Sequence, residues 1–466
     1  MKNPFLELTR GRVVGFFGIG KSNLALLAML AGTGVPVILR SDKEIRREIL
    51  PEGFNLVGIF EGDAAARDIR ENLLIFSPSV RRNRAEFLAA KQRGCVFTSD
   101  FEIFLRYNEK PIFLVTGSDG KSTTTTLAAS MLGADFPAIG NLGVPMTEAL
   151  NMDSRGYVIE ASSFMLEYAR PAARRAVLTS LSENHLDWHG SFEDYKAAKI
   201  GTIKEAREAV ISADSPAIFD AFSDKKMYAK KMYTKKMYAK KMHDDGKEIF
   251  AVCSQNFSED ELKRSFRAKA YYSISGGYIL RNGERIFHLS EAYRREDFNI
   301  KNYMNALALT DGFADEERRR ELIRDFRGLA HRCEIFAEIE GVKFINSSID
   351  TSPERTISTL QSLPRGLIIL LGGRDKNLSF APLAALISAR GDRPIIYGEA
   401  REKISQAFGA YPHICRKFFR EAVEITKKNA RPGDTVLLSP AAASYDEFSS
   451  FEERGNSFKS LILGHI

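Results

Sequence analysis

The stretch Pro111-Ile-Phe-Leu-Val-Thr-Gly-Ser-Asp-Gly-Lys-Ser-Thr123 decides the fold class. Its first half is a run of apolar and β-branched residues, which predicts a buried strand ending near Thr116. Its second half is a turn of glycines and small polar residues, and the segment after it is expected to be helical through about Leu132. A strand that passes through a glycine-rich turn into a helix is typical of parallel α/β sheets.

The same turn predicts a phosphate-binding site. Backbone N–H groups and the dipole of the following helix together form a cradle for a polyphosphate. Lys121 is placed to reach the β- and γ-phosphates of ATP, and Ser122 is placed to ligate Mg²⁺. The usual loop has a further glycine where this chain has Val115, so this is a shorter variant. The residues expected to contact ATP here are Gly117, Ser118, Asp119, Gly120, Lys121, Ser122 and Thr123.

Two further blocks of the chain repeat the alternation of short apolar strands with amphipathic helical stretches. The length of 466 residues suits two or three domains of about 100–200 residues each. We therefore predict an α/β protein of three domains, spanning residues 1–106, 107–328 and 329–466. Further strands are expected at residues 13–19, 35–40, 156–160, 176–180, 343–346, 366–371, 394–397 and 435–438, and a further helix at residues 21–31.

The positive charge of the chain is local. The formal net charge is +7, but eight lysines lie in a Lys-Lys-Met-Tyr repeat between Lys225 and Lys241 and account for the whole excess. A basic face for nucleic acid is therefore not implied, and no nucleic-acid partner is expected. The repeat period of five residues gives neither a helix nor a strand a constant apolar side. Residues 225–242 are predicted to form a surface insertion, with a functional basic patch as the alternative.

Cysteine spacing and hydropathy indicate the cellular setting. The four cysteines, at positions 95, 253, 333 and 415, have no spacing typical of a zinc site, a redox motif or a disulfide framework. The segment from Met1 to Arg12 is polar and contains Pro4, and the sequence has no apolar run of 18 residues. We expect a cytoplasmic protein with no membrane partner.

A second glycine turn, Gly18-Ile-Gly20-Lys-Ser-Asn23, follows the first predicted strand. It is a partial dinucleotide fingerprint that lacks the third glycine. Its backbone N–H groups suit the diphosphate of a UDP-sugar as well as that of NAD. Asp42 lies near the distance at which a dehydrogenase places its ribose-binding acid. A plain tight turn is the third interpretation.

The motifs that follow the phosphate-binding turn resemble the central domain of the Mur ligase family in order and spacing. They are Asn141 in Gly140-Asn-Leu-Gly143, Glu160 in Val158-Ile-Glu-Ala-Ser-Ser-Phe164, His185 in Glu183-Asn-His-Leu-Asp187, Lys199 in Tyr195-Lys-Ala-Ala-Lys199, Asn302 and Asn305 in Asn302-Tyr-Met-Asn-Ala-Leu307, and His331-Arg332.

The third block is similar to the branch of this family that adds D-glutamate. The similar stretches are Leu371-Gly-Gly-Arg-Asp-Lys376, Ser439-Pro-Ala-Ala-Ala-Ser-Tyr-Asp-Glu-Phe448 and Phe451-Glu-Glu-Arg-Gly455. The Asp-Asn-Pro-Arg motif of the branches that add diamino acids is absent from the sequence. The resemblance implies a Rossmann-like UDP-binding domain, a central P-loop ATPase-type domain and a Rossmann-like C-terminal domain.

The resemblance also implies the reaction, which is addition of D-glutamate to UDP-N-acetylmuramoyl-L-alanine with ATP, through an acyl phosphate, by a monomer. Lys121, Glu160, His185 and Lys199 would be catalytic. Ser122, Glu160, His185 and Lys199, the last if carbamylated, would hold two Mg²⁺ ions. Asn305 and Arg332 would also bind ATP. The UDP-linked substrate would contact Gly18, Gly20, Lys21, Ser22, Arg40, Ser41, Asn141 and Ser162, and D-glutamate would contact Thr351, Lys376, Ser444 and Phe451.

The match fails at one place. Ser347 and Ile349 stand where the family pattern has an aspartate and a lysine that help to hold ATP. Arg355 and Arg374 are near enough in sequence to replace the missing cation. His189, four residues after His185, is expected to be a solvent-facing loop histidine rather than a metal ligand because Gly190 follows it.

Three other functions remain open on the sequence. A ligase that adds glutamate to a folate, or another amino acid to a muramoyl peptide, would share the turn and the lysine but lack the tail around Ser444. A non-catalytic nucleotide-binding module would not need the whole set of Lys121, Ser122, Glu160, His185 and Lys199. An NAD-dependent dehydrogenase would leave the second block unexplained.

Overall fold

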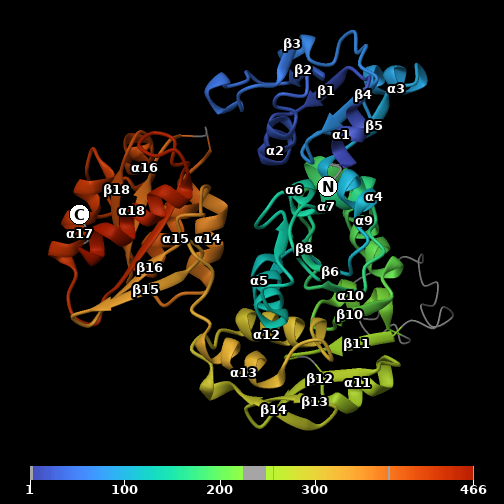
Figure 1. Cartoon of the computed structure of the whole chain (residues 1–466). Coiled ribbons are helices and arrows are strands. Elements are labelled where there is room, and N and C mark those ends of the chain that lie inside the picture. Colours follow the sequence, from blue (N-terminus) through green and yellow to red (C-terminus); the bar gives the residue numbers. More distant parts are fainter. Residues whose placement is uncertain (1–3, 224–247, 256, 376–377, 465–466) are drawn as a thin grey trace. The chain divides into compact units, whose positions relative to one another are not determined.

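The computed structural model describes residues 4–223, 248–255, 257–375 and 378–464. The repeat at residues 225–242 and Lys376 therefore lie outside the described residues. The chain divides into two compact units, residues 1–324 and 325–466, which are described separately (Figure 1).

The first unit begins with a five-stranded parallel sheet in the order β3-β2-β1-β4-β5. The central strand β1 pairs with β2 on one side and with β4 on the other, and it is buried throughout because its side chains pack into apolar clusters on both faces of the sheet. Its strands are β1 (Val14–Phe17), β2 (Pro36–Ser41), β3 (Asn55–Glu61), β4 (Leu73–Phe76) and β5 (Val96–Thr98). Its helices are α1 (Pro4–Thr9), α2 (Lys21–Met29), α3 (Ala85–Gln92) and α4 (Asp100–Tyr107), with short 3₁₀ turns at Arg47–Ile49 and Gly62–Ala64.

The same unit continues into a nine-stranded sheet in the order β14-β13-β12-β11-β10-β9-β6-β8-β7. Strands β6 to β12 are parallel, as the sequence predicts, whereas β13 and β14 run antiparallel. The antiparallel edge follows from two tight turns, Gly276-Gly277 and Asn282-Gly283, in which all four residues have positive φ. Such two-residue turns join neighbouring antiparallel strands.

The strands of this central sheet are β6 (Ile112–Thr116), β7 (Ala138–Gly140), β8 (Tyr157–Glu160), β9 (Arg175–Leu178), β10 (Glu208–Ser212), β11 (Glu248–Val252), β12 (Ala270–Ser275), β13 (Tyr278–Arg281) and β14 (Glu284–His288). Its helices are α5 (Lys121–Leu132), α6 (Met146–Ala149), α7 (Ser163–Tyr168), α8 (Leu186–His189), α9 (Phe192–Glu205), α10 (Pro216–Phe222), α11 (Glu259–Ser265), α12 (Asp297–Leu309) and α13 (Glu316–Asp325), with a 3₁₀ turn at Leu289–Glu291.

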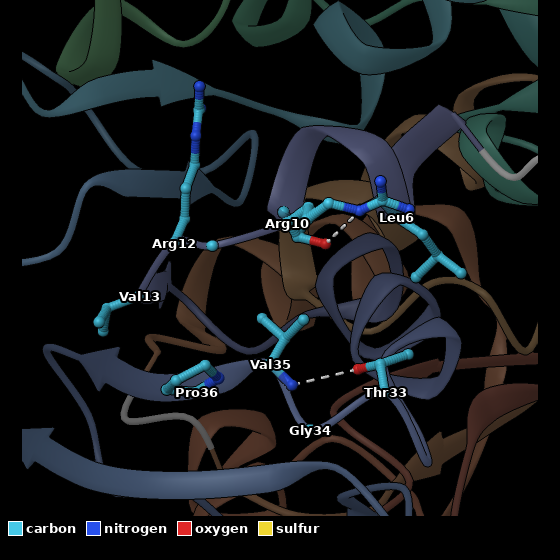
Figure 2. A pocket seen from close by; sticks show the side chains of 10 residues that line it. Leu6, Arg10, Arg12, Val13, Thr33, Gly34, Val35 and Pro36 are labelled. Atoms are coloured by element: carbon cyan, nitrogen blue, oxygen red, sulfur yellow. Dashed lines mark hydrogen bonds between the residues drawn. The ribbon is translucent and has the colours of Figure 1, made fainter.

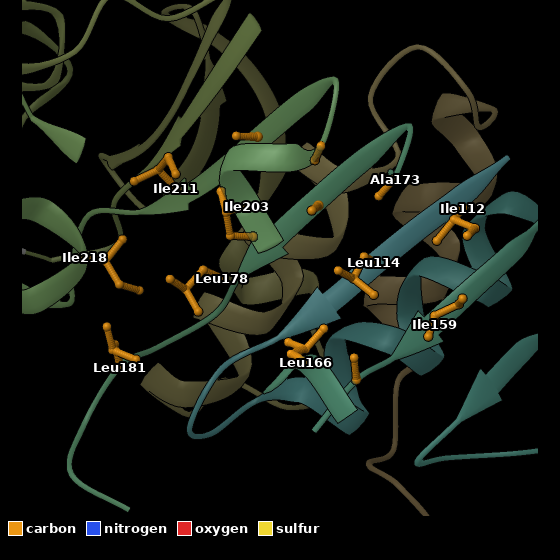
Figure 3. Close-up of a cluster of buried hydrophobic side chains, with 14 of the residues drawn as sticks. Ile112, Leu114, Ile159, Leu166, Ala173, Leu178, Leu181, Ile203, Ile211 and Ile218 are labelled. Atoms are coloured by element: carbon orange, nitrogen blue, oxygen red, sulfur yellow. The ribbon is translucent and has the colours of Figure 1, made fainter. Parts of the chain in front are cut away.

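The core of the central sheet explains why β6 reads as an unbroken apolar run. Every residue of β6 is buried, because helices cover both faces of a parallel sheet. Ile112 and Leu114 alternate with Phe113 and so point to the same face. Figure 3 shows them in one apolar cluster with Ile159 of β8 and Leu178 of β9.

The second unit contains a six-stranded sheet in the order β15-β16-β20-β17-β18-β19. All neighbouring strands are parallel except β15 and β16. Its strands are β15 (Glu334–Ile339), β16 (Val342–Asn346), β17 (Ile368–Gly372), β18 (Arg393–Tyr397), β19 (Ile414–Cys415) and β20 (Thr435–Ala441). Its helices are α14 (Pro353–Gln361), α15 (Ala381–Arg390), α16 (Arg401–Phe408), α17 (Phe419–Asn429) and α18 (Phe451–Leu463).

These sheets confirm the α/β class and each strand expected from the sequence. The four cysteines are free. Within the described ranges, no helix is both long enough and apolar enough to cross a membrane.

Candidate active site

The phosphate-binding turn between β6 and α5 admits glycine alone at two positions. Gly117 has φ +152° and Gly120 has φ +80°, where side chains are disfavoured. A Cβ atom on Gly117 would lie 2.0 Å from Thr179 Oγ1, and one on Gly120 would lie 2.4 Å from Asn302 Oδ1. The turn is therefore packed tightly between the end of β9 and helix α12.

Hydrogen bonds fix the middle of this turn. Ser118 donates its backbone N–H to the Ser180 carbonyl at 2.9 Å, and its Oγ lies 2.9 Å from the Tyr195 hydroxyl. Asp119 donates its backbone N–H to Ser180 Oγ at 2.8 Å. Lys121 Nζ donates to the Ser118 carbonyl at 2.8 Å, so its ammonium group lies over the turn. The shape of the turn is thus fixed by contacts within the protein.

Lys199 lies directly under the turn. Its side chain is almost fully buried, and its Nζ donates to the Gly117 carbonyl at 2.8 Å and to Thr116 Oγ1 at 3.2 Å. Burial lowers the pKa of Lys199 well below its ordinary range, and the charge of Lys121 lowers it further. Glu160 and Asp119 oppose this shift only in part. Lys199 consequently has much more neutral amine than a surface lysine at the same pH.

Glu160 ends β8 beside the turn, because it pairs in register with Val115 of β6. Its side chain is 1% exposed. Oε1 accepts a hydrogen bond from Asn141 Nδ2 at 3.0 Å, whereas Oε2 is buried with no partner within the described residues. A buried carboxylate oxygen without a donor is costly, so this atom marks a place for a cation.

His185 stands in a strained backbone conformation. Its φ of 54° is left-handed, which is uncommon for a residue other than glycine and is often found at functional sites. The side chain is exposed and its ring lies 4.9 Å from that of Phe164. Phe164 follows Ser162, the N-cap of α7, whose Oγ accepts from the Met165 N–H at 3.4 Å.

The expectation for His189 is wrong. It is the last residue of α8 and is buried, because its ring packs against Phe164 and Tyr195. Gly190 ends this short helix, so the glycine did not indicate a loop at His189. Burial lowers the pKa of His189, which keeps the ring neutral at physiological pH.

Helix α12 brings two asparagines to this region. Asn302 contacts Gly120 and Thr124 of the phosphate-binding segment. Asn305 is 1% exposed, and both polar atoms of its amide lack partners within the described part of the chain. An unsatisfied buried amide favours a bound group with both a donor and an acceptor.

The N-terminal glycine turn lies at the carboxyl edge of the first sheet. Gly18 has φ +80°, and its N–H donates to the Arg40 carbonyl at 2.8 Å. A Cβ on Gly18 would lie 2.9 Å from Ser77 Cβ, whereas one on Gly20 would have 3.5 Å to Ser77 Oγ. The motifs named in the sequence did not include Ser77. Its signal was its place directly after β4, a strand beside β1.

The remaining residues predicted for the UDP-linked substrate differ in availability. Lys21, the first residue of α2, donates Nζ to the Gly143 carbonyl at 2.7 Å, which links the first sheet to the loop after β7. Ser22 follows it in α2, and Ser41 ends β2. These side chains are partly or well exposed.

The expectation for Arg40 needs correction. Its side chain is 1% exposed and pairs with buried Glu71 at 2.5 Å. It also donates to the carbonyls of Ala65, Arg67 and Asp68. The guanidinium is thus used inside the first sheet's core and is not available to a substrate.

The C-terminal candidates surround the carboxyl edge of the third sheet. Ser444 is buried just after β20, and Thr351 lies just before α14. Phe451 begins α18 and accepts a hydrogen bond at its carbonyl from Ser348 Oγ at 2.8 Å. Arg374 carries an antiparallel bridge to Ala443, which joins the Gly372-Gly373 turn to the loop after β20.

Arg454 holds these loops together, and no role was predicted for it. Its side chain is fully buried, and none of the described acidic groups forms an ion pair with it. It donates to Ser348 Oγ and to the Ser348 carbonyl, both at 3.0 Å, and to the Ala442 carbonyl at 3.1 Å. One guanidinium therefore ties the end of β16 to the end of β20.

At Ser347 and Ile349, where the sequence differs from the family pattern, a nearby arginine contacts the backbone. Ser347 is fully buried and accepts the Cys333 N–H at 3.2 Å. Arg355 Nη1 donates to the Ile349 carbonyl at 3.2 Å, whereas Arg374 is 58% exposed and lies 3.9 Å from Glu399. Arg355 thus places a guanidinium beside the position of the missing lysine, and its role there stays a hypothesis.

A cavity of about 590 Å³ lies at the opposite edge of the first sheet. Figure 2 shows Val13, Arg12 and Pro36 around it, at the amino ends of β1 and β2. Ligands of open α/β sheets bind at the carboxyl ends of the strands. This cavity is therefore separate from the candidate site.

Two family matches cover most of the chain. Residues 115–310 match the Mur ligase middle domain, and residues 331–442 match the Mur ligase glutamate ligase domain. A UDP-N-acetylmuramoylalanine--D-glutamate ligase of Clostridium tetani is 31% identical over 99% of this chain and 98% of its own. The chain belongs to the Mur ligase family. A Clostridium kluyveri relative of the same name is 32% identical over the same shares of the two chains.

Solved structures of other Mur ligases have the same fold as this Mur ligase. The UDP-N-acetylmuramate-alanine ligase of Thermotoga maritima matches with a TM-score of 0.55 and 16% identity, covering 98% of this chain and all of that one. A pseudomurein peptide ligase type C from Methanothermus fervidus matches with a TM-score of 0.52, the same identity and the same coverage. At this identity they support the fold alone.

Proposed function

We propose that this Mur ligase adds D-glutamate to UDP-N-acetylmuramoyl-L-alanine with ATP, through an acyl phosphate. The observation that carries the proposal is the likeness, over nearly the whole chain, to relatives named for this reaction. A cytoplasmic location and a monomeric state remain predictions.

The ATP site is assigned to the turn from Gly117 to Thr123. Its backbone N–H groups and the N-terminus of the 12-residue helix α5 suit the phosphates, with Lys121 as the mobile cation. The unsatisfied amide of Asn305 suits a base or ribose with paired donors and acceptors. Arg332, in the second unit, stays a predicted ATP contact.

Magnesium is proposed beside Glu160 and Ser122. The free Oε2 atom of Glu160 is a hard oxygen donor, and Ser122 begins α5 next to Lys121. Within the described residues, no three His, Cys, Asp or Glu side chains are grouped closely enough to hold a metal alone. Mg²⁺ commonly takes its other ligands from phosphates and water. Such an ion would neutralise charge on the phosphates, and His185 stays a predicted second ligand.

Lys199 is proposed to be carbamylated. Its lowered pKa favours the neutral amine, which is the form that attacks carbon dioxide. The new N–C bond forms with loss of one proton, and the product is an anion in place of a cation. That exchange would remove the repulsion between Lys199 and Lys121 and provide another oxygen ligand for Mg²⁺.

The reaction itself would proceed in two balanced steps. An oxygen of the alanyl carboxylate attacks the γ-phosphorus, and ADP leaves. The amine of D-glutamate then attacks the acyl carbon, and phosphate leaves with that carboxylate oxygen while the amine loses its proton. Lys121 would stabilise the charge of the transferred phosphoryl group in both steps.

The two remaining substrates are assigned to the N-terminal and the C-terminal sheet. The diphosphate of the UDP-linked substrate is proposed to bind at Gly18, Gly20 and Lys21, with Ser77 beside them. D-glutamate is proposed to bind near Ser444, Thr351 and Phe451, on loops that Arg454 holds in place. Lys376, a predicted partner for a substrate carboxylate, follows Asp375 in the sequence and lies outside the described residues.

The test is phosphate release with UDP-N-acetylmuramoyl-L-alanine and ATP against a panel of D- and L-amino acids. We expect release that depends on D-glutamate. Phosphate release with another amino acid would mean that this amino acid, and not D-glutamate, is the acceptor. Phosphate release without any amino acid would mean that the protein only hydrolyses ATP. Nicotinamide reduction in the same samples tests the dehydrogenase alternative, and none is expected.

A further inference from the structure

The loop after β4 carries three arginines within four residues, at positions 81, 82 and 84. The loop lies against the N-terminal glycine turn. A Cβ on Gly18 would lie 2.9 Å from Ser77 Cβ and 3.0 Å from Val80 Cγ2. Arg81 follows Val80 directly, so its backbone lies next to that turn.

Two of these arginines have partners that explain their positions. Arg82 pairs with Glu102 at 2.6 Å, and its guanidinium lies 4.3 Å from the ring centroid of Tyr168. Arg84 forms a bidentate pair with Asp42 on the surface, with one contact of 2.7 Å. The charge of each of these two side chains is therefore paired within the protein.

Arg81 differs from both in its charge pairing. Its Nε is buried without a hydrogen-bond partner, as is that of Arg82, but no acidic side chain in the described ranges forms an ion pair with Arg81. Its guanidinium carbon lies 5.7 Å from the ring centroid of Trp188, in the helix that follows His185. The indole N–H donates to Glu167 at 2.9 Å, so that carboxylate is already engaged.

The half-buried guanidinium of Arg81 has an Nε donor with neither an acceptor nor access to water, which is unfavourable until an anion binds. Its planar fork of donors matches the oxygens of a phosphate in a way that lysine does not. Burial lowers the pKa of the neighbouring His189, and the charge of Arg81 contributes to that shift. The positive charge of Arg81 therefore acts on a residue of α8 as well as on its own loop.

We propose that Arg81 binds the diphosphate of the UDP-linked substrate, between the Gly18–Gly20 turn and the helix that follows His185. This rests on the proposed function. The backbone N–H groups of the turn supply neutral donors on one side. Arg81 supplies a second full positive charge beside that of Lys21, on a planar group that can donate two hydrogen bonds to one phosphate.

Direct binding measured by calorimetry tests this role without requiring catalysis. The ligands are UDP, uridine and UDP-N-acetylmuramoyl-L-alanine, and the proteins are wild type, Arg81→Ala, Arg81→Lys and Arg84→Ala. Arg81→Ala is expected to raise the Kd for UDP and for the full substrate about 10- to 100-fold, as for a lost charge-assisted hydrogen bond. Uridine binding should not change, and Arg81→Lys should fall between.

Arg84→Ala is the matched control from the same loop, and its Kd for UDP should change less than about twofold. The thermal midpoint of ligand-free Arg81→Ala should equal or exceed that of wild type, because the variant loses an unpaired shielded cation. A lower midpoint would assign Arg81 a structural role and overturn the inference.

Three further results of the binding measurements would test the role of Arg81. If Arg81→Ala weakens the full substrate but not UDP, the arginine contacts the muramoyl-alanine part and the diphosphate assignment is wrong. If wild type binds no UDP, the inference fails whatever the ligase activity. If wild type binds UDP through Arg81 but releases no phosphate with D-glutamate, the inference stands and the proposed function fails.

Discussion

The chain contains two strand–glycine–helix junctions that look alike in sequence and differ in their surroundings. At the junction of β6 and α5, a Cβ on Gly117 would lie 2.0 Å from Thr179 Oγ1, and buried Lys199 donates to the Gly117 carbonyl. At the junction of β1 and α2, Gly20 leaves 3.5 Å to the nearest side-chain atom. Its neighbour Lys21 is exposed.

This difference teaches how one type of junction serves two tasks. The central junction is rigid and surrounded by desolvated charge, which suits a transition state whose charge must be met by fixed groups. The N-terminal junction is tight at Gly18 but open at Gly20, and its lysine is exposed, which suits binding of a diphosphate that does not react. We therefore expect substitutions at the central junction to change catalysis and substitutions at the N-terminal junction to change binding.

The largest contrast is expected between the two lysines that begin the helices. Lys121→Ala should lower kcat about 100- to 1000-fold, because a cation at the reacting phosphates is lost. Lys21→Ala should leave kcat near wild type and raise KM for the UDP-linked substrate less than about tenfold. Steady-state kinetics with each substrate varied in turn measures both. Equal effects on kcat would break the distinction between the junctions.

Lys199→Met is expected to reduce turnover about 100-fold, since removal of the amine removes both the carbamate and its anionic charge. Lys196→Met, three residues earlier in the same helix, should keep turnover near wild type because the ion pair and the ring contact of Lys196 are local, with Glu193 and Phe192. Added bicarbonate should raise wild-type activity in buffer depleted of carbon dioxide. Full activity of Lys199→Met would overturn the carbamate.

Lys199→Met lowers turnover, but in carbon-dioxide-free buffer it is expected to remove a loss of stability that the wild type shows at lower pH. The folded pKa of Lys199 lies below its ordinary value of 10.5, so between these two values the unfolded chain binds a proton that the folded site refuses. Wild-type stability therefore falls as the pH decreases through this window, and Lys199→Met should remove that slope. Urea unfolding of the ligand-free proteins at pH 7 to 10 measures it. A wild-type protein that is more stable at pH 7 than at pH 10 would contradict the lowered pKa of Lys199.

The glycines give the smallest contrast. Gly117→Ala should destabilise the fold by about 2 kcal/mol or more, because it adds strain at φ +152° and a clash with Thr179. Gly20→Ala should cost less than about 0.5 kcal/mol, since Gly20 has an extended φ of −107° and open space. Chemical denaturation gives both values, and comparable losses would mean that the N-terminal turn is as tightly packed as the central one.

The sequence predicted the fold class and the strands because their signals are local. An apolar strand, a glycine turn and a helix lie within some twenty residues, and that pattern depends little on the rest of the chain. The antiparallel edge strands β13 and β14 were not predicted, although their Gly-Gly and Asn-Gly turns are strong hairpin signals.

The errors at single residues have a common cause, which is that the partners are distant in sequence. Arg40 looked like a substrate ligand because it ends a strand, but Glu71 occupies it from 31 residues away. The roles of Ser77 and Arg454 likewise depend on contacts with Gly18, Ser348 and Ala442. The spacing of residues along the sequence cannot predict these contacts.

The most direct test of the central claim follows one oxygen atom. The alanyl carboxylate of UDP-N-acetylmuramoyl-L-alanine is labelled with ¹⁸O, and the phosphate released with ATP and D-glutamate is analysed by mass spectrometry. An acyl phosphate formed at the Gly117–Ser122 turn requires one labelled oxygen in each phosphate released, and no release without the amino acid. Unlabelled phosphate would mean that water attacks ATP directly, which contradicts the account.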